Sequence, residues 1–244
     1  MKRATLHVYP ECDELISSMA DFFVKIANES IAKRQEFVVA LAGGSSPEAL
    51  YRLLASPAYN MKIDWGKVYF FFGDERYVPI TDAESNAFMA RKTLFDPLQI
   101  PASNIFMVDT RQTPELAAEA YNNELEEHFH SKPVVFDLII LGLGEDAHTA
   151  SLFPYTAILQ ETQAKVKSVF VDKKNTFRIS FTAPLINDAR HVAFFVYGKN
   201  KAKAVRNVLV DDPDPEQFPA QLIQTERGEV HWFMEEEAAS QIAG

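Results

Sequence analysis

The sequence contains a single cysteine, Cys12, among 244 residues. No intrachain disulfide can form, and a zinc site with four cysteine ligands is excluded, so a reducing compartment such as the cytoplasm is expected. Long apolar runs are also missing. The stretch 134–141 (VVFDLIIL) is far shorter than the roughly 20 residues of a membrane helix, and residues 1–10 lack a signal-peptide core. We predict a soluble protein without a membrane partner.

Basic residues are few, with 24 Lys and Arg against 34 Asp and Glu, which gives a formal net charge of −10. Affinity for nucleic-acid backbones comes largely from Lys and Arg that displace counterions. A chain this acidic is therefore not expected to bind nucleic acid in general. A local basic pocket for a small anionic ligand remains compatible with the overall charge.

Short β-branched or aromatic runs alternate with segments whose apolar residues recur at helical spacing, and this alternation predicts βαβ units. The chain is predicted to form one α/β domain over residues 1–244, a three-layer Rossmann-like fold with a mainly parallel central sheet flanked by helices. Ligands of such folds bind outside the carboxyl ends of the strands. The predicted strands are 6–9, 37–41, 68–72, 105–108, 135–141, 169–171, 177–181, 192–196 and 230–233.

Residues 42–47 (AGGSSP) lie between a predicted strand and a predicted helix. Gly43, Gly44 and Ser45 would let an anion approach the backbone N–H groups at the start of a helix. The same residues also suit a tight turn with Ser46 as N-cap and Pro47 at the first helical position. No Gly-Lys-Ser/Thr follows, so the loop is not a Walker loop, and the pattern of a nucleophile elbow is absent.

A second loop follows the apolar run 68–72 and begins with residues 73–79 (GDERYVP). Charged side chains at the end of a buried strand must pair with one another or with a ligand. Arg76 could bind a phosphate through two hydrogen bonds, or it could form a structural pair with Asp74. Asn86 further along fits either a ligand contact or a helix cap.

The third loop, residues 142–148 (GLGEDAH), formally matches the dinucleotide fingerprint. We reject that interpretation because two acidic residues would stand where a pyrophosphate approaches, and the segment does not open a βαβ unit. His148, two residues after Asp146, suits acid–base chemistry better, because a neutral imidazole can take a proton from water. A helix-capping Asp146 with a solvated His148 is the alternative. His128 and His130 lie at a predicted helix end and are not expected to bind a metal.

Taken together, these segments resemble 6-phosphogluconolactonase of the glucosamine/galactosamine-6-phosphate isomerase superfamily, and the resemblance extends almost from end to end. The most specific part is the string 146–154 (DAHTASLFP) with 74–76 (DER) upstream. The further matching segments are 42–47, 72–79, 85–86, 136–145, 178–182, 184–190 and 198–202.

The resemblance implies hydrolysis of 6-phospho-D-glucono-1,5-lactone in the pentose phosphate pathway, with neither a metal nor another cofactor. It makes His148 the general base that activates water and Asp146 the residue that orients it. Residues expected to contact the substrate and its phosphate are Gly43, Gly44, Ser45, Asp74, Arg76, Asn86, Arg178 and Lys201.

One residue departs from the family pattern, because Ala147 stands where the family has glycine. Two other functions share the superfold. A glucosamine-6-phosphate deaminase would need a glutamate where Phe153 stands and a tyrosine where Arg76 stands. A non-catalytic sugar-phosphate sensor of the transcription-regulator type would need an attached helix-turn-helix, for which we see no room before the first predicted strand.

Overall fold

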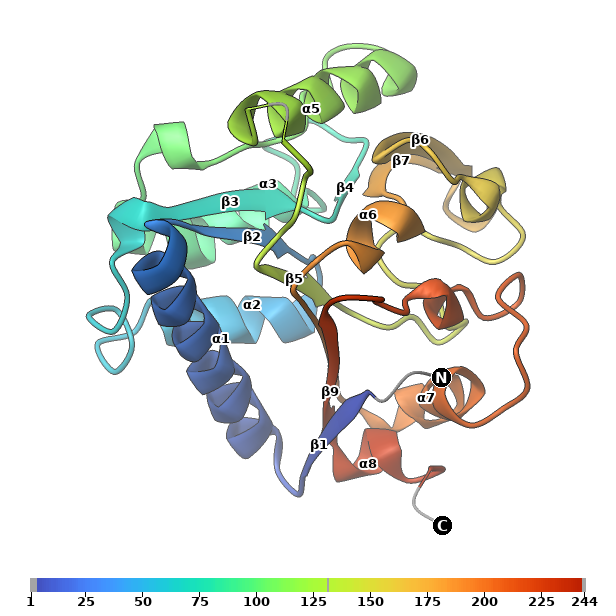
Figure 1. The fold of residues 1–244 in the computed structure, drawn as a ribbon. Coiled ribbons are helices and arrows are strands. Elements are labelled where there is room, and N and C mark those ends of the chain that lie inside the picture. Colours follow the sequence, from blue (N-terminus) through green and yellow to red (C-terminus); the bar gives the residue numbers. More distant parts are fainter. Residues whose placement is uncertain (1–3, 131, 243–244) are drawn as a thin grey trace.

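The computed structural model describes residues 4–130 and 132–242. Its main sheet has six strands in the order β1-β9-β8-β5-β2-β3, and all neighbouring pairs are parallel (Figure 1). The strands are β1 (Thr5–Tyr9), β2 (Phe37–Leu41), β3 (Val68–Phe72), β5 (Leu138–Leu141), β8 (His191–Val196) and β9 (Glu229–Glu235). The predicted α/β class with a parallel sheet flanked by helices is confirmed.

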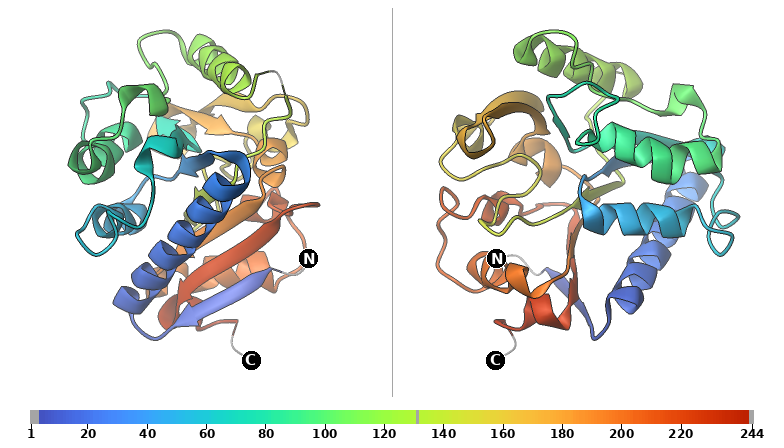
Figure 2. Two further views of the ribbon diagram at one scale, coloured as in Figure 1. Left: turned by 60° about the vertical axis from the view of Figure 1, so that its left-hand side comes forward. Right: turned by 180° about the vertical axis from the view of Figure 1, so that it is seen from behind.

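Helices cover both faces of this sheet (Figures 1 and 2). They are α1 (Cys12–Arg34), α2 (Ser45–Leu54), α3 (Asn86–Ala90), α4 (Asp96–Leu98), α5 (Pro114–His128), α6 (Ala183–Asn187), α7 (Ala202–Leu209) and α8 (Glu236–Ala239). Between α3 and α4 the chain forms a π-helical turn over Arg91–Phe95. Thr113 caps α5, since its side chain accepts a hydrogen bond from Leu116 N.

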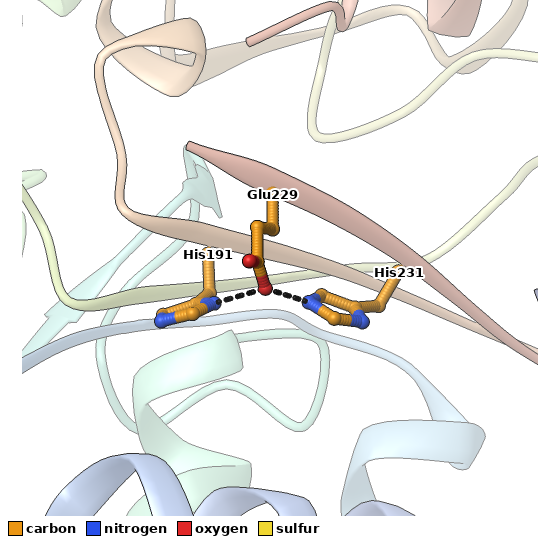
Figure 3. A group of neighbouring side chains, drawn as sticks. All are labelled: His191, Glu229 and His231. Atoms are coloured by element: carbon orange, nitrogen blue, oxygen red, sulfur yellow. Dashed lines mark hydrogen bonds and ion pairs between the residues drawn. The ribbon is translucent and has the colours of Figure 1, made fainter. Parts of the chain in front are cut away.

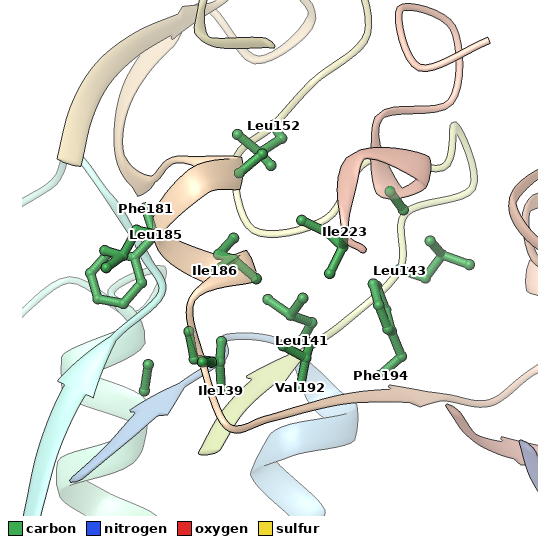
Figure 4. Packing of buried hydrophobic residues seen from close by; sticks show 14 of the residues in the cluster. Ile139, Leu141, Leu143, Leu152, Phe181, Leu185, Ile186, Val192, Phe194 and Ile223 are labelled. Atoms are coloured by element: carbon green, nitrogen blue, oxygen red, sulfur yellow. The ribbon is translucent and has the colours of Figure 1, made fainter. Parts of the chain in front are cut away.

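Two hydrophobic clusters lie on the two faces of the main sheet, because alternate residues of each strand point to opposite faces. Val39 and Leu41 pack with α1, α2 and α3, whereas Val38 and Ala40 pack on the other side. Figure 4 shows the second side, where side chains of β5 and β8 meet Ile186 of α6. Burial on both faces explains why these strands are apolar at nearly every position.

A second, three-stranded antiparallel sheet stands beside the first, in the order β4-β7-β6. Its strands are β4 (Asp74–Arg76), β7 (Thr176–Phe181) and β6 (Val166–Val171). The chain passes from β3 to β4 through Gly73, whose N–H donates to Leu41 O at 2.9 Å and whose carbonyl accepts from Phe181 N at 2.8 Å. The prediction of a loop directly after 68–72 was wrong for β4, whose strand partner, β7, lies about 100 residues further along the chain.

Two further local predictions were wrong. Helix α2 begins at Ser45 with Gly44 as its N-cap, so Ser46 lies within the first turn. Gly44 has a φ of +102°, and this left-handed turn lets the helix start earlier than a serine cap would. Residues 105–108 form no strand apart from one bridge between Ile105 and Phe70. The apolar pattern there reflects packing, since Phe106 stacks on Phe71 at 4.3 Å between ring centroids.

The segments 42–44, 73–86 and 142–154 follow the carboxyl ends of β2, β3 and β5. The first is shorter than the predicted 42–47 because α2 begins at Ser45, and the second contains β4. Because the strands are parallel and adjacent, the three loops come together at one edge of the main sheet. Within residues 4–130 and 132–242, the helices are all too short or too polar to cross a bilayer.

Candidate active site

One cavity of about 490 Å³ lies at this edge of the sheet, a volume suited to a small-molecule ligand. Its walls come from the three loops, from β7 and the turn that precedes it, and from the turn before α7. Seven of the ten predicted site residues line it: Gly43, Gly44, Asp74, Arg76, His148, Arg178 and Lys201. Ser45, Asn86 and Asp146 are not among the lining residues, and their contacts are described below.

His148 and Asp146 form a pair at the cavity edge. The distance from His148 Nδ1 to Asp146 Oδ1 is 2.5 Å, and Lys173 Nζ lies 3.5 Å from Asp146 Oδ2. The hydrogen bond with His148 is the main reason that the pKa of Asp146 lies well below its usual range. Since an ionised carboxylate can only accept, the proton of the neutral imidazole is held on Nδ1. Nε2 therefore carries the lone pair that a general base needs.

The imidazole is also held by packing. Phe153 stacks on His148 with 4.0 Å between ring centroids and an interplanar angle of 21°. A side chain at Gly144 would collide with the imidazole and with Asp146. Gly144 N donates to His148 O at 2.8 Å, and Ala147 N donates to Gly144 O at 3.0 Å. The loop is thus a tight turn in which residue 144 must lack a Cβ.

These contacts give Gly144 a requirement that Gly142, the other glycine of the loop, does not have. A Cβ at Gly142 meets nothing within 4 Å, and neither glycine has a positive φ. We expect Gly144→Ala to displace His148 and to lower kcat by about tenfold or more, since small misplacements of a catalytic group are costly. Gly142→Ala is the matched control: Gly142 also lines the cavity, but its added Cβ leaves His148 in place, so the rate should fall less than in Gly144→Ala. Equal rates in both variants, measured with equal folded fractions, would contradict this packing.

Ala147, which stands where the family has glycine, has a strained backbone conformation. Ala147 has a φ of +61° and is fully buried, and its carbonyl accepts from Ala220 N at 3.0 Å. A left-handed non-glycine residue costs of order 1 kcal/mol. Ala150 and Tyr155 in the same loop also have positive φ, at +47° and +61°. The surrounding contacts fix the loop geometry, and Ala147 fits it with its methyl group in the hydrophobic cluster.

Arg76 and Arg178 stand directly opposite each other in the β4–β7 ladder. Like charges in directly opposed positions destabilise a sheet. The side chain of Arg178 is buried, and its Nη1 finds no hydrogen-bond partner among the residues that the structure describes. Burial, together with the nearby Arg76, lowers the pKa of Arg178. Two guanidinium groups that face one cavity in this way form a site for an anion.

Lysines add to the positive charge of this cavity. Lys201 ends the turn before α7, and Lys174 lies in the hairpin between β6 and β7. Sequence reasoning missed Lys174 and Thr176, which also lines the cavity. Their position after a predicted strand in the segment 172–176 (DKKNT) was the available signal, but only strand pairing shows that this hairpin reaches the cavity.

The remaining predicted residues support the walls. Asn86 is buried, its Nδ2 donates to Asp74 O at 2.8 Å, and its amide occupies the space that a Cβ on Gly43 would need. Asp74 accepts from Ser151 Oγ at 2.6 Å, which ties β4 to the third loop. Ser45 is the first residue of α2. The structure therefore places Asn86 behind the first loop and Ser45 at the helix start.

Glu75 holds the segment 75–87 together through hydrogen bonds, although the sequence alone assigned it no role. Its carboxylate accepts from the backbone N–H groups of Arg76, Asn86 and Ala87 at 2.7 to 2.8 Å, and from Ser85 Oγ at 3.1 Å. Burial raises the pKa of Glu75, and the three backbone donors partly offset that effect. This buried carboxylate fixes β4 to the start of α3 and thereby positions Arg76.

We expect Glu75→Gln to lower the free energy of unfolding by about 2 kcal/mol. The substituted NH2 group cannot accept, so at least one buried N–H donor loses its partner. Glu48→Gln is the control, since Glu48 forms an exposed pair with Arg52 that is worth at most about 0.5 kcal/mol. Urea unfolding of the three proteins measures the difference. A Glu75→Gln variant as stable as wild type would show that the network contributes little.

Comparisons with known proteins assign the chain to a family. The family model described as "Glucosamine-6-phosphate isomerases/6-phosphogluconolactonase" matches residues 10–232. The chain belongs to this family. The family description names two kinds of enzyme, isomerases and lactonases. The individual relatives and the site therefore have to distinguish between these two activities.

Several similar proteins of this family carry the second name. A 6-phosphogluconolactonase of Nostoc sp. is 36% identical over 99% of both chains, and one of Synechocystis sp. is 39% identical over 88% of both. Among solved structures, 6-phosphogluconolactonase from Trypanosoma cruzi superimposes with a TM-score of 0.88 at 27% identity, covering 99% of this chain and 98% of that one. The predicted family resemblance is confirmed.

Proposed function

We propose that residues 1–244 act as a single catalytic domain that hydrolyses 6-phospho-D-glucono-1,5-lactone to 6-phosphogluconate, in the cytoplasm and within the pentose phosphate pathway. The observation that carries this proposal is one cavity with an oriented histidine and a group of cations. His148 supplies the chemistry, while Arg76, Arg178, Lys174 and Lys201 form the positive part of the wall. The relatives' printed names support the substrate class.

In the proposed reaction the cations hold the phosphate and the lactone carbonyl lies near His148. Nε2 of His148 takes a proton from water as the water oxygen attacks the carbonyl carbon. The bond between that carbon and the ring oxygen then breaks, and the imidazolium returns the proton to the ring oxygen. Asp146 holds Nδ1 throughout and stabilises the transient positive charge on the ring.

The site gives less support to the isomerase or deaminase alternative. That chemistry requires a carboxylate beside the loop histidine, and here the side chain of Phe153 stacks on the imidazole. An apolar ring at this position neither donates nor accepts a proton. Lactone hydrolysis needs no second acid–base group besides His148 and its partner.

The decisive test follows freshly prepared 6-phosphogluconolactone by NMR with and without the protein, after subtraction of spontaneous hydrolysis. We expect catalytic acceleration without added metal. Glucosamine 6-phosphate serves as the alternative substrate, and turnover of it without turnover of the lactone would overturn the proposal. Binding of the phosphorylated sugar with no acceleration of either reaction would indicate the sensor.

A further inference from the structure

A second group of polar side chains lies at the opposite edge of the main sheet. His191 is the first residue of β8, and Glu229 is the first residue of β9. The cavity described above lies at the carboxyl ends of the parallel strands, so these residues mark the other edge. At about 3.3 Å per residue, the six residues of β8 separate the two edges by nearly 20 Å.

The strand register brings three side chains of this group together. His191 pairs with Glu229 across β8 and β9, and His231 follows two residues later on the same face of β9. Figure 3 shows the two imidazoles directed from either side toward one carboxylate oxygen. His231 Nε2 lies 3.2 Å from Glu229 Oε2, and His191 Nδ1 lies 3.6 Å from it.

We propose that His191, Glu229 and His231 bind a divalent transition-metal ion of the zinc type. One ligand atom from each residue lies within 4.8 Å of the other two. In a tetrahedral zinc site, bonds of about 2.0 to 2.1 Å place neighbouring ligand atoms roughly 3.3 Å apart. Two imidazole nitrogens and one carboxylate oxygen form a common zinc ligand set and disfavour magnesium and calcium.

The hydrogen bonding of the group leaves one nitrogen to be explained. Nδ1 of His191 is buried and lacks a hydrogen-bond partner within residues 4–130 and 132–242, because 3.6 Å to Glu229 exceeds a hydrogen bond. A buried nitrogen without a partner is costly. Coordination of a metal ion by this atom would satisfy it, and the same ion would draw in the carboxylate and Nε2 of His231.

The outer contacts fit the same proposal. His231 Nδ1 lies 3.2 Å from His7 Nε2, so a metal-bound His231 can donate its remaining N–H to His7. Phe22 of α1 packs against His231 with 4.7 Å between ring centroids and limits its movement.

The site can be reached by a cation, and three of the four basic side chains in the recess beside it have acidic partners. A recess of about 260 Å³ reaches His191 and Glu229, and the Glu229 side chain is 67% exposed. Four basic side chains line the same recess. Arg34 and Arg190 are paired with the buried Asp137, at 2.6 Å and 3.3 Å, and Lys33 lies 4.0 Å from Glu29. Arg227 is the fourth, and its positive charge weighs against a cation. The proposal is independent of the lactonase function, because the site lies at the far edge of the sheet.

The test uses the full chain, freed of metal by dialysis against a chelator and titrated with ZnCl2 by calorimetry. We expect a Kd in the micromolar range or below. Glu229→Gln and His191→Ala should each raise this Kd at least about tenfold. His7→Gln should weaken binding about tenfold through its contact with His231. With Co²⁺ in place of Zn²⁺, the visible absorption bands of a tetrahedral site should appear and be lost in Glu229→Gln.

Two control variants keep this result specific. His130→Ala removes an exposed imidazole outside the group, and His148→Ala removes the imidazole of the active site. Both should bind Zn²⁺ as the wild type does, and removal of zinc should leave lactone hydrolysis unchanged. No binding by the wild type would overturn the proposal. So would binding that persists in Glu229→Gln and disappears in His148→Ala.

Discussion

Replacement of His148 by alanine is expected to lower kcat for lactone hydrolysis by roughly 10²- to 10⁴-fold, the usual contribution of a general base. The reason lies in the orientation of the ring. Asp146 and the Phe153 stack hold the imidazole at the cavity, with Nδ1 bound to the carboxylate and Nε2 left as the basic atom. The measurement is the initial rate at saturating 6-phosphogluconolactone, with spontaneous hydrolysis subtracted.

The control for this variant is His130→Ala, which removes an exposed imidazole elsewhere. It should retain the wild-type rate, and circular dichroism should show both variants folded. If folded His148→Ala kept full activity, the water would be activated by another group and the proposed mechanism would be wrong. Lactone hydrolysis itself could still be the function in that case.

The second large effect is expected for Arg178→Met. Two charge-assisted hydrogen bonds from a guanidinium to a phosphate contribute about 3 kcal/mol together, which corresponds to about a 100-fold rise in KM. The value of kcat should change little, because a phosphate remote from the carbonyl is bound equally in the ground and transition states. Steady-state kinetics over a range of lactone concentrations separates the two constants.

Stability gives this variant a second measurable outcome. Nη1 of Arg178 has no hydrogen-bond partner in the described part of the chain, and this atom and the facing Arg76 are unfavourable without an anion. Methionine of similar length removes the buried charge, so the thermal midpoint of the ligand-free protein should not fall. Arg206→Met, at an exposed pair with Asp211, is the control and should leave KM unchanged. A fall in kcat alone would instead place Arg178 near the carbonyl.

Several features of this protein could be predicted from its sequence alone. The alternation of apolar runs and helical periodicity predicted the parallel sheet, because burial on both faces makes strands such as 68–72 apolar throughout. The loop with Asp146 and His148 could also be predicted, because the two residues that form the pair lie only two positions apart. Positioning of these loops at one edge followed from the parallel topology itself.

Other features depended on contacts between distant segments. The opposition of Arg76 and Arg178, the reach of Lys174 into the cavity and the network of Glu75 all arise from the β4–β7 pairing and the packing of α3. The grouping of His191 with Glu229 and His231 arises from the β8–β9 register. Local sequence determines which segments form strands and loops, whereas the register between distant strands is set by the packing of the whole core. Only the tertiary structure could therefore decide which charged side chains share a site.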